Sequence, residues 1–159
     1  ADLSTPLDAI GDFLEILESH GHVEMVLGSR VRLLGRTVER YWWRHYLGRV
    51  FATLVAWMLR LPVYDTQCGA KLFRATQATV ALFEDPFVST WLFDVEIVAR
   101  SVIRSRRAGT NPARLIYELP LREWRDVPGS KLSRMAYVRA ASSLAMVWWA
   151  YCGDLGRRP

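Results

Sequence analysis

The sequence predicts an α/β fold, of which this chain is expected to be the C-terminal part. First, stretches with helical periodicity alternate with short runs of strand character. Second, only two clear strands are evident among five helices, and two strands alone do not form a stable sheet. Third, the chain opens "ADLSTPLDAI", without Met, directly into a capped helix. We therefore expect a preceding strand of the same domain, and the partners of the two strands, to lie upstream.

The first helix is predicted over residues 5–21. Thr5 is suited to the N-cap position and Pro6 to the first helical position, and Gly21 is expected to end the helix. Apolar residues then recur at helical spacing and predict the buried face: Leu7, Ile10, Leu14 and Leu17. The run "VEMVLGSR" that follows predicts a short strand.

A long helix is predicted over residues 37–61, ended by Pro62. Arg36, Arg40 and Arg44 are four residues apart and would share one face. The apolar side is marked by Trp42, Tyr46, Val50, Leu54 and Met58.

Beyond a loop that begins after Pro62, helices are predicted over residues 75–84 and 91–106. "RLIYELPLREW" alternates with a period of two and predicts a strand, whose apolar face is Leu115, Tyr117, Leu119 and Leu121. "RDVPGSKL" predicts a loop. We divide the chain into residues 1–132, the C-terminal part of an α/β domain, and residues 133–159, an amphipathic helix and tail.

Composition excludes several classes of protein. Of the 159 residues, 51% are hydrophobic, which excludes a disordered chain. The longest apolar run, residues 50–59, is shorter than the roughly 20 residues of a membrane-spanning helix. Cys68 and Cys152 lack the spacing of a zinc site or a disulfide framework. The net charge of +5 is compatible with an anionic partner.

The segment "DTQCGAKLFR", residues 65–74, is too rich in functional groups for a linker. Three other polar segments accompany it: residues 2–5, residues 28–30 together with Arg40 and Arg44, and residues 129–131. Arginine forks and lysine ammonium groups suit phosphate oxygens, and a neighbouring carboxylate suits a hard divalent ion. Taken singly, each segment is also compatible with a helix cap, a solvated face or a simple turn.

Together, these segments resemble a known family. Six short strings resemble those of the polyprenyl-phosphate sugar transferases among the family 2 glycosyltransferases, in the same order and near the same spacing. They are "ADLSTP", "GSR", "ERYWWR…GR", "DTQCGAKLFR", "WLFDVEI" and "GSKL". DTQCG-K-LF and GSKL together resemble the dolichyl-phosphate β-glucosyltransferase branch. The resemblance covers residues 1–132. It implies the C-terminal part of a Rossmann-like GT-A domain that lacks its N-terminal nucleotide-binding strands, with "ADLSTP" as the remainder of a DXD stretch.

The resemblance also implies residue roles. The acceptor phosphate would be bound by Arg30, Arg40, Arg44, Ser130 and Lys131. The substrate-binding set would be Gln67, Gly69, Lys71 and Asp94. Gln67 and Lys71 would hold sugar hydroxyls or shape the loop, Gly69 would let the backbone turn tightly, and Asp94 would orient the acceptor or hold a nearby arginine. The catalytic set would be Asp65, Arg44 and Lys131, with Asp65 as a base or a metal partner. Asp2 would hold Mg²⁺ or Mn²⁺, while Cys68 would be buried packing, since no base lies beside it in the sequence.

The implied reaction moves a sugar, expected to be glucose from UDP-glucose, to a polyprenyl phosphate of the dolichyl type with inversion. The acceptor phosphate is largely a dianion at neutral pH and can attack without a general base. We expect a peripheral enzyme on the cytoplasmic face of a membrane, with the aromatic final helix around Trp148 and Trp149 at the interface or, alternatively, covering the sheet.

Two other functions stay open from the sequence. The 159-residue chain alone is expected to be inactive, and a non-catalytic membrane-associated remnant is one alternative. A basic nucleic-acid-binding module is the other. The arginines, which cluster in discrete loops, and the lack of a binding-module signature disfavour it, so no nucleic-acid partner is expected.

Overall fold

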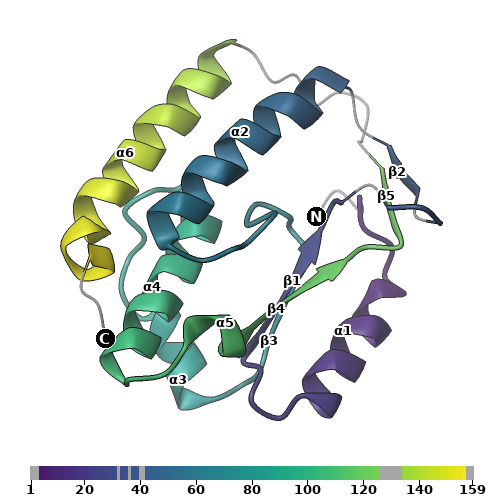
Figure 1. The fold of residues 1–159 in the computed structure, drawn as a ribbon, viewed down its shortest axis with the longest axis horizontal. Coiled ribbons are helices and arrows are strands. Elements are labelled where there is room, and N and C mark those ends of the chain that lie inside the picture. The colour runs from purple at the N-terminus through teal and green to yellow at the C-terminus, as the bar shows by residue number, and fades with distance from the viewer. Residues whose placement is uncertain (1–3, 32, 36, 40–41, 126–133, 157–159) are drawn as a thin grey trace.

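The computed structural model describes residues 4–31, 33–35, 37–39, 42–125 and 134–156. Its helices and strands follow one another as shown in Figure 1. In chain order they are α1 (Ala9–Ser19), β1 (Met25–Ser29), β2 (Thr37–Glu39), α2 (Trp42–Leu59), β3 (Lys71–Phe73), α3 (Gln77–Val80), η1 (Ala81–Phe83), α4 (Phe93–Arg107), α5 (Pro112–Leu115), β4 (Ile116–Pro120), β5 (Glu123–Arg125) and α6 (Arg134–Gly156).

A three-stranded sheet in the order β3-β1-β4 forms the centre of the molecule. The central strand β1 pairs antiparallel with β3 and parallel with β4. All five residues of β1 are buried, which explains why this strand reads as a continuous apolar run. A second, parallel pair consists of β2 and β5. The mixed α/β class is therefore confirmed, and β3 is a strand where the sequence predicted only a loop.

Helices cover both faces of the sheet. In Figure 1, α1 lies on one side of the sheet, and α2, α4 and α6 lie on the other. Side chains of β1 that point in opposite directions enter two separate hydrophobic clusters. Met25 and Leu27 pack with the three helices, whereas Val26 packs with α1 and Trp124. This two-sided burial leaves the strand ends as the place where polar groups gather.

Helix α1 differs from its prediction in both its start and its buried face. It begins at Ala9, and Thr5 and Pro6 precede it in a turn. Phe13 and Leu17 are its buried residues. Of the predicted face, Leu17 is buried, but Leu7, Ile10 and Leu14 are exposed, at 68%, 50% and 45%. A second apolar stripe, offset by one position along the helix, packs against the sheet.

Helix α2 shows a similar correction. The predicted first turn is strand β2, and the helix starts at Trp42. Of the predicted apolar side, Met58 is buried, but Tyr46, Val50 and Leu54 are exposed; Val55 and Leu59 enter the core instead. Since α2 carries apolar side chains around most of its circumference, periodicity could not select the face that packs.

The remaining elements lie close to their predictions. The helix predicted over residues 75–84 is divided into α3 and η1, while α4 and β4 occur where the sequence indicated. Acidic residues occupy the first turn of α4 and arginines its last turn, an arrangement that favours the helix dipole.

Candidate active site at the carboxyl ends of two parallel strands

The candidate site lies where β1 and β4 end. The two strands are parallel neighbours, with Ser29 opposite Pro120, so their carboxyl ends meet at one edge of the sheet. Ligands of open α/β sheets bind outside this edge. Arg30 follows β1 directly, and the segment 64–70 crosses the same edge before it enters β3.

An arginine–carboxylate pair forms the centre of the site. Arg30 Nε donates to Asp65 Oδ2 at 2.6 Å, and Arg30 Nη2 donates to Asp65 Oδ1 at 2.8 Å. The backbone amide of Arg30 also donates to Asp65 Oδ2, at 3.1 Å. The guanidinium lies 5.3 Å from the centroid of the Trp124 ring. This two-point contact fixes the direction of the guanidinium plane. The structure thus joins two residues whose roles the sequence assigned separately.

Glu118, which the sequence analysis did not select, holds the backbone of the segment that carries Asp65. Its carboxylate accepts hydrogen bonds from the amides of Tyr64 at 2.8 Å and Asp65 at 2.7 Å. Burial raises the pKa of Glu118, and these two amide contacts act in the opposite direction. In the sequence, Glu118 lies in a strand on the side opposite the apolar alternation, which is typical of a solvated residue. No local signal marks it as part of the site.

Lys71 and Asp94 form a second ion pair, with 2.7 Å between Lys71 Nζ and Asp94 Oδ1. Only 6% of the Lys71 side chain is exposed, and its ammonium group also donates to the carbonyl of Cys68. The contact joins the start of β3 to the first turn of α4. Cys68 is buried, as predicted, and burial raises the pKa of its thiol.

Close packing between the strand and this segment occurs at Gly28. Its amide donates to the Ala70 carbonyl at 2.8 Å. A Cβ on Gly28 would lie 3.0 Å from that oxygen and 3.2 Å from Leu121 Cδ2. Gly69, which the sequence analysis expected to permit a tight turn, has open space around its Cα and no positive φ. The close approach therefore depends on Gly28.

A small cavity of about 50 Å³ opens beside the central ion pair, between α2 and the segment before β3. Its lining includes Arg30, Asp65 and Gln67. Arg49, from α2, also lines it, and the Arg49 guanidinium lies 3.7 Å from the centroid of the Tyr64 ring. Arg49 ends the string "ERYWWR…GR", so the motif contained this residue, although the sequence analysis gave it no role.

Several predicted site residues cannot be placed. Asp2, Arg40, Ser130 and Lys131 lie outside the described residues, and so does the side chain of Arg44 in α2. Within the described residues, no group of three or more His, Cys, Asp or Glu side chains is arranged to hold a metal ion. The metal prediction, which concerned Asp2, stays a prediction.

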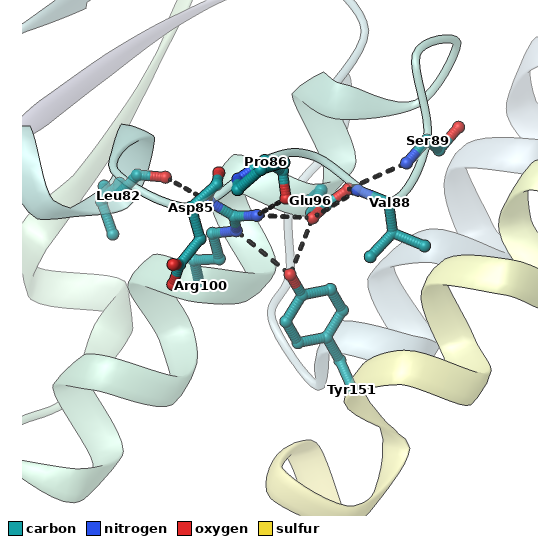
Figure 2. Close-up of polar contacts among 8 residues, drawn as sticks. All are labelled: Leu82, Asp85, Pro86, Val88, Ser89, Glu96, Arg100 and Tyr151. Carbon is teal, nitrogen blue, oxygen red and sulfur yellow. Dashed lines mark hydrogen bonds and ion pairs between the residues drawn. The ribbon is translucent and has the colours of Figure 1, made fainter.

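A buried polar cluster joins α6 to α4 behind the site (Figure 2). The Glu96 carboxylate is fully buried and accepts hydrogen bonds from Tyr151 Oη at 2.7 Å and from Arg100 Nη2 at 2.8 Å. The amides of Val88 and Ser89 donate to it as well. Because Asp94 lies in the first turn of α4 together with Glu96, this cluster anchors the part of the helix that carries the partner of Lys71.

The outer surfaces of α2 and α6, which lie side by side in Figure 1, are rich in exposed apolar residues. These are Tyr46, Val50, Leu54, Trp57, Val138, Met146, Trp148 and Trp149. The rings of Trp57 and Trp148 stack with centroids 6.2 Å apart and an interplanar angle of 19°. None of the helices in the described part of the chain is long and apolar enough to cross a membrane.

Comparison with known proteins identifies the class to which this arrangement belongs: the chain is related to glycosyltransferases. It is 32% identical over 130 residues to the dolichyl-phosphate β-glucosyltransferase of Saccharomyces cerevisiae, covering 80% of this chain and 36% of that protein. The dolichyl-phosphate β-glucosyltransferase of Drosophila melanogaster gives the same values. A third, from Trichomonas vaginalis, is 28% identical over 151 residues, covering 92% of this chain and 42% of the relative.

These similarities confirm the glycosyltransferase family that the motifs indicated, and the three relatives are named dolichyl-phosphate β-glucosyltransferases. The chain spans less than half the length of these relatives and corresponds to a part of them. No family model and no solved structure matches the chain.

Proposed function

We propose that this chain provides the acceptor side of an inverting glycosyltransferase that moves glucose from UDP-glucose to a polyprenyl phosphate of the dolichyl type. The observation that carries the proposal is the cavity between α2 and residues 64–67, which combines two arginines with a fixed carboxylate. The dolichyl-phosphate β-glucosyltransferases among the relatives support the acceptor class and the sugar.

The charges in the cavity suit a phosphate monoester. Asp65 orients Arg30 and offsets part of its charge, while Arg49 adds a second guanidinium to the same cavity. Guanidinium forks bind phosphate oxygens in a defined orientation. We propose that Arg40, Arg44, Ser130 and Lys131, which the motifs assign to the same phosphate, complete the binding site.

The reaction that follows is a single displacement. The phosphate oxygen attacks the anomeric carbon of the nucleotide sugar, the carbon–oxygen bond to the leaving diphosphate breaks, and the anomeric configuration inverts. Because the acceptor is already largely a dianion at neutral pH, no side chain has to remove a proton. Asp65 then serves mainly to orient Arg30, and the role of base that the motifs left open is not required.

On the donor side, we propose that Gln67 contacts sugar hydroxyls, since it lines the cavity. Lys71 and Asp94 are committed to each other and to the Cys68 carbonyl. They would therefore act on the donor mainly by fixing the segment around Gly69. A GT-A arrangement of the complete catalytic domain is part of the same proposal.

For Mg²⁺ or Mn²⁺ the described residues supply no ligand set. One carboxylate at Asp2 falls short of the six or more oxygen ligands that such ions take, including waters and phosphates. We propose that the ion is held mainly by the donor diphosphate and by residues elsewhere in the complete protein.

We also propose that the exposed apolar surfaces of α2 and α6 rest on the cytoplasmic face of the membrane that contains the lipid acceptor. Tryptophans on one side of adjacent helices are typical of an interfacial element. Replacing Leu54 and Trp149 together with serine should abolish cosedimentation with anionic phospholipid vesicles without loss of helix content. Retained cosedimentation would argue against this surface.

The transfer reaction can be tested with this chain extended upstream to the length of its relatives. Polyprenyl phosphate and a panel of radiolabelled UDP- and GDP-sugars would be supplied, with Mg²⁺ or Mn²⁺, and label would be counted in the lipid phase. We expect label from UDP-glucose. Arg30→Gln and Arg49→Gln should each lower kcat/KM for the acceptor by roughly 10- to 100-fold, the value of a charge-assisted hydrogen bond. The 159 residues alone should transfer no sugar.

The control is Arg107→Gln, at the opposite end of α4, where the side chain is 65% exposed. It should retain wild-type activity. Label from a different nucleotide sugar would keep the acceptor and change the donor. A folded protein that labels lipid from no donor would refute the proposal and favour a non-catalytic role.

A further inference from the structure

The segment that carries Asp65 is held at the site by a side chain. The amides of Tyr64 and Asp65 both donate to the Glu118 carboxylate, one to each oxygen, at 2.8 and 2.7 Å. Glu118 lies in β4, whose register against β1 is fixed by parallel pairing, with Glu118 opposite Leu27. A rigid sheet position therefore defines where the backbone of Asp65 lies.

The two carboxylates act in sequence. Glu118 fixes the Asp65 backbone, and the Asp65 side chain fixes Arg30 through Nε, Nη2 and the backbone amide. The contact with Arg30 is largely buried, with 9% of the Asp65 side chain exposed. A displacement of the Asp65 backbone would therefore move the guanidinium that faces the cavity.

We propose that Glu118 is a positioning residue of this site: it sets the place of Asp65 and, through Asp65, the place of the Arg30 guanidinium. This inference rests on the proposed function, in which Arg30 binds the acceptor phosphate. Glu118 itself touches neither substrate. Its effect is expected on the acceptor and on the rate of transfer, because a small misplacement of a binding group costs up to about 100-fold.

Two substitutions separate position from charge. Glu118→Gln keeps the shape of the side chain, but one of its two ends is an NH₂ group, which cannot accept from an amide. One of the two backbone amides then loses its acceptor. Glu118→Asp keeps the charge on a shorter side chain that cannot reach both amides. Glu84→Gln, on an exposed residue, is the matched control.

The first measurement is residue-resolved amide hydrogen exchange in the protein that carries this chain. In Glu118→Gln, exchange of the Tyr64 or Asp65 amide should be about 10- to 100-fold faster, as expected for a lost hydrogen bond to a charged group. The amide of Gly28, which donates to Ala70, should be unchanged and reports that the sheet is intact. Exchange at Tyr64 and Asp65 equal to wild type would overturn the inference.

The second measurement is steady-state transfer to polyprenyl phosphate. In both Glu118 variants, kcat/KM for the acceptor should fall about 10- to 100-fold, with KM for the nucleotide sugar within about twofold of wild type. Wild-type kinetics in a Glu118→Gln protein would refute the positioning role while leaving the proposed function intact. If wild type itself transfers no sugar, the proposed function fails, and the exchange measurement decides alone whether Glu118 positions the segment. Should Glu118→Gln not fold, both measurements are made on Glu118→Asp.

Discussion

Tyr151→Phe tests how firmly α6 is attached to the rest of the fold. The substitution removes one oxygen, which donates to Glu96 at 2.7 Å and accepts from Arg100 Nε at 3.1 Å (Figure 2). A hydrogen bond to a charged group contributes about 1.5–3 kcal/mol. Glu96 keeps the donors on Val88, Ser89 and Arg100, so the carboxylate is not left isolated. We expect a loss of about 2 kcal/mol in the free energy of unfolding.

The assay is urea unfolding at pH 7, followed by far-ultraviolet circular dichroism. With an m-value of about 2 kcal/mol/M, the midpoint should fall by about 1 M urea at constant m. Tyr117→Phe is the matched control, because the Tyr117 hydroxyl takes part in no hydrogen bond within the described residues; its midpoint should be unchanged. A loss below about 0.5 kcal/mol for Tyr151→Phe, or an equal loss in both variants, would refute the anchoring role of this cluster.

Three further predictions concern the candidate site. Gly28→Ala places a Cβ 3.0 Å from a backbone oxygen, and should destabilise the fold by about 1–3 kcal/mol in urea unfolding. The control Gly153→Ala, at a position in α6 with open space around it, should be neutral or stabilising by up to about 1 kcal/mol. A larger loss of stability in Gly153→Ala than in Gly28→Ala would contradict the close packing at Gly28. Burial raises the pKa of Glu118 above 4.5, so its contribution to stability is present below that pH and is lost as pH rises through the folded pKa. The free energy of unfolding of Glu118→Gln should therefore rise relative to that of wild type between about pH 4 and pH 7. If the two proteins show the same dependence of stability on pH, Glu118 is not a buried carboxylate with a raised pKa. Asp94→Asn leaves a buried Lys71 ammonium without its carboxylate and should lower the free energy of unfolding by about 3–5 kcal/mol. The double variant Lys71→Met/Asp94→Leu should regain most of that stability in thermal unfolding. A double variant as unstable as Asp94→Asn would contradict a mainly structural role of the pair.

The sequence was most informative where functional groups gathered in short strings. "GSR" and "DTQCGAKLFR" directed attention to Arg30 and Asp65, and the structure brings these two residues into one ion pair. A string reports which residues belong together near a site, because their side chains are unusual for their local context. It does not report which residue contacts which, since that depends on the register between β1 and the segment before β3.

Helix faces were harder to predict, for a physical reason. Periodicity identifies a buried stripe only when the opposite face is polar. Helix α2 is apolar around most of its circumference, so the stripe through Tyr46, Val50 and Leu54 was as plausible as the one through Val55 and Leu59. In the structure the second stripe packs against the core and the first is exposed. An excess of apolar residues on a helix therefore leaves the choice of the buried face to tertiary packing, which the local sequence does not report.

The short strands β2 and β3 escaped prediction because each has three residues, too few to show alternation. Strand β5 begins within the single strand predicted over "RLIYELPLREW", which the structure divides into β4 and β5. The strand character of β2 and β3 comes from pairing with distant segments. Lys71 illustrates this: it opens β3 opposite Leu27, yet in the sequence it ends a polar string. Hydrogen bonds formed across 40 or so residues of sequence leave no local pattern.

Glu118 shows most clearly what local sequence omits. Burial raises the pKa of Glu118, so ionisation of its carboxylate at neutral pH costs the fold part of its stability. Two backbone amides offset part of that cost, and they belong to the segment that carries Asp65. A group whose ionisation costs stability while it orders a binding segment is expected at functional sites, where activity and stability favour different residues. Loss of transfer in Glu118→Gln, together with a relative gain in stability at higher pH, would be the joint signature of that conflict, whereas a carboxylate with a purely structural role would show the same pH dependence without the loss of transfer.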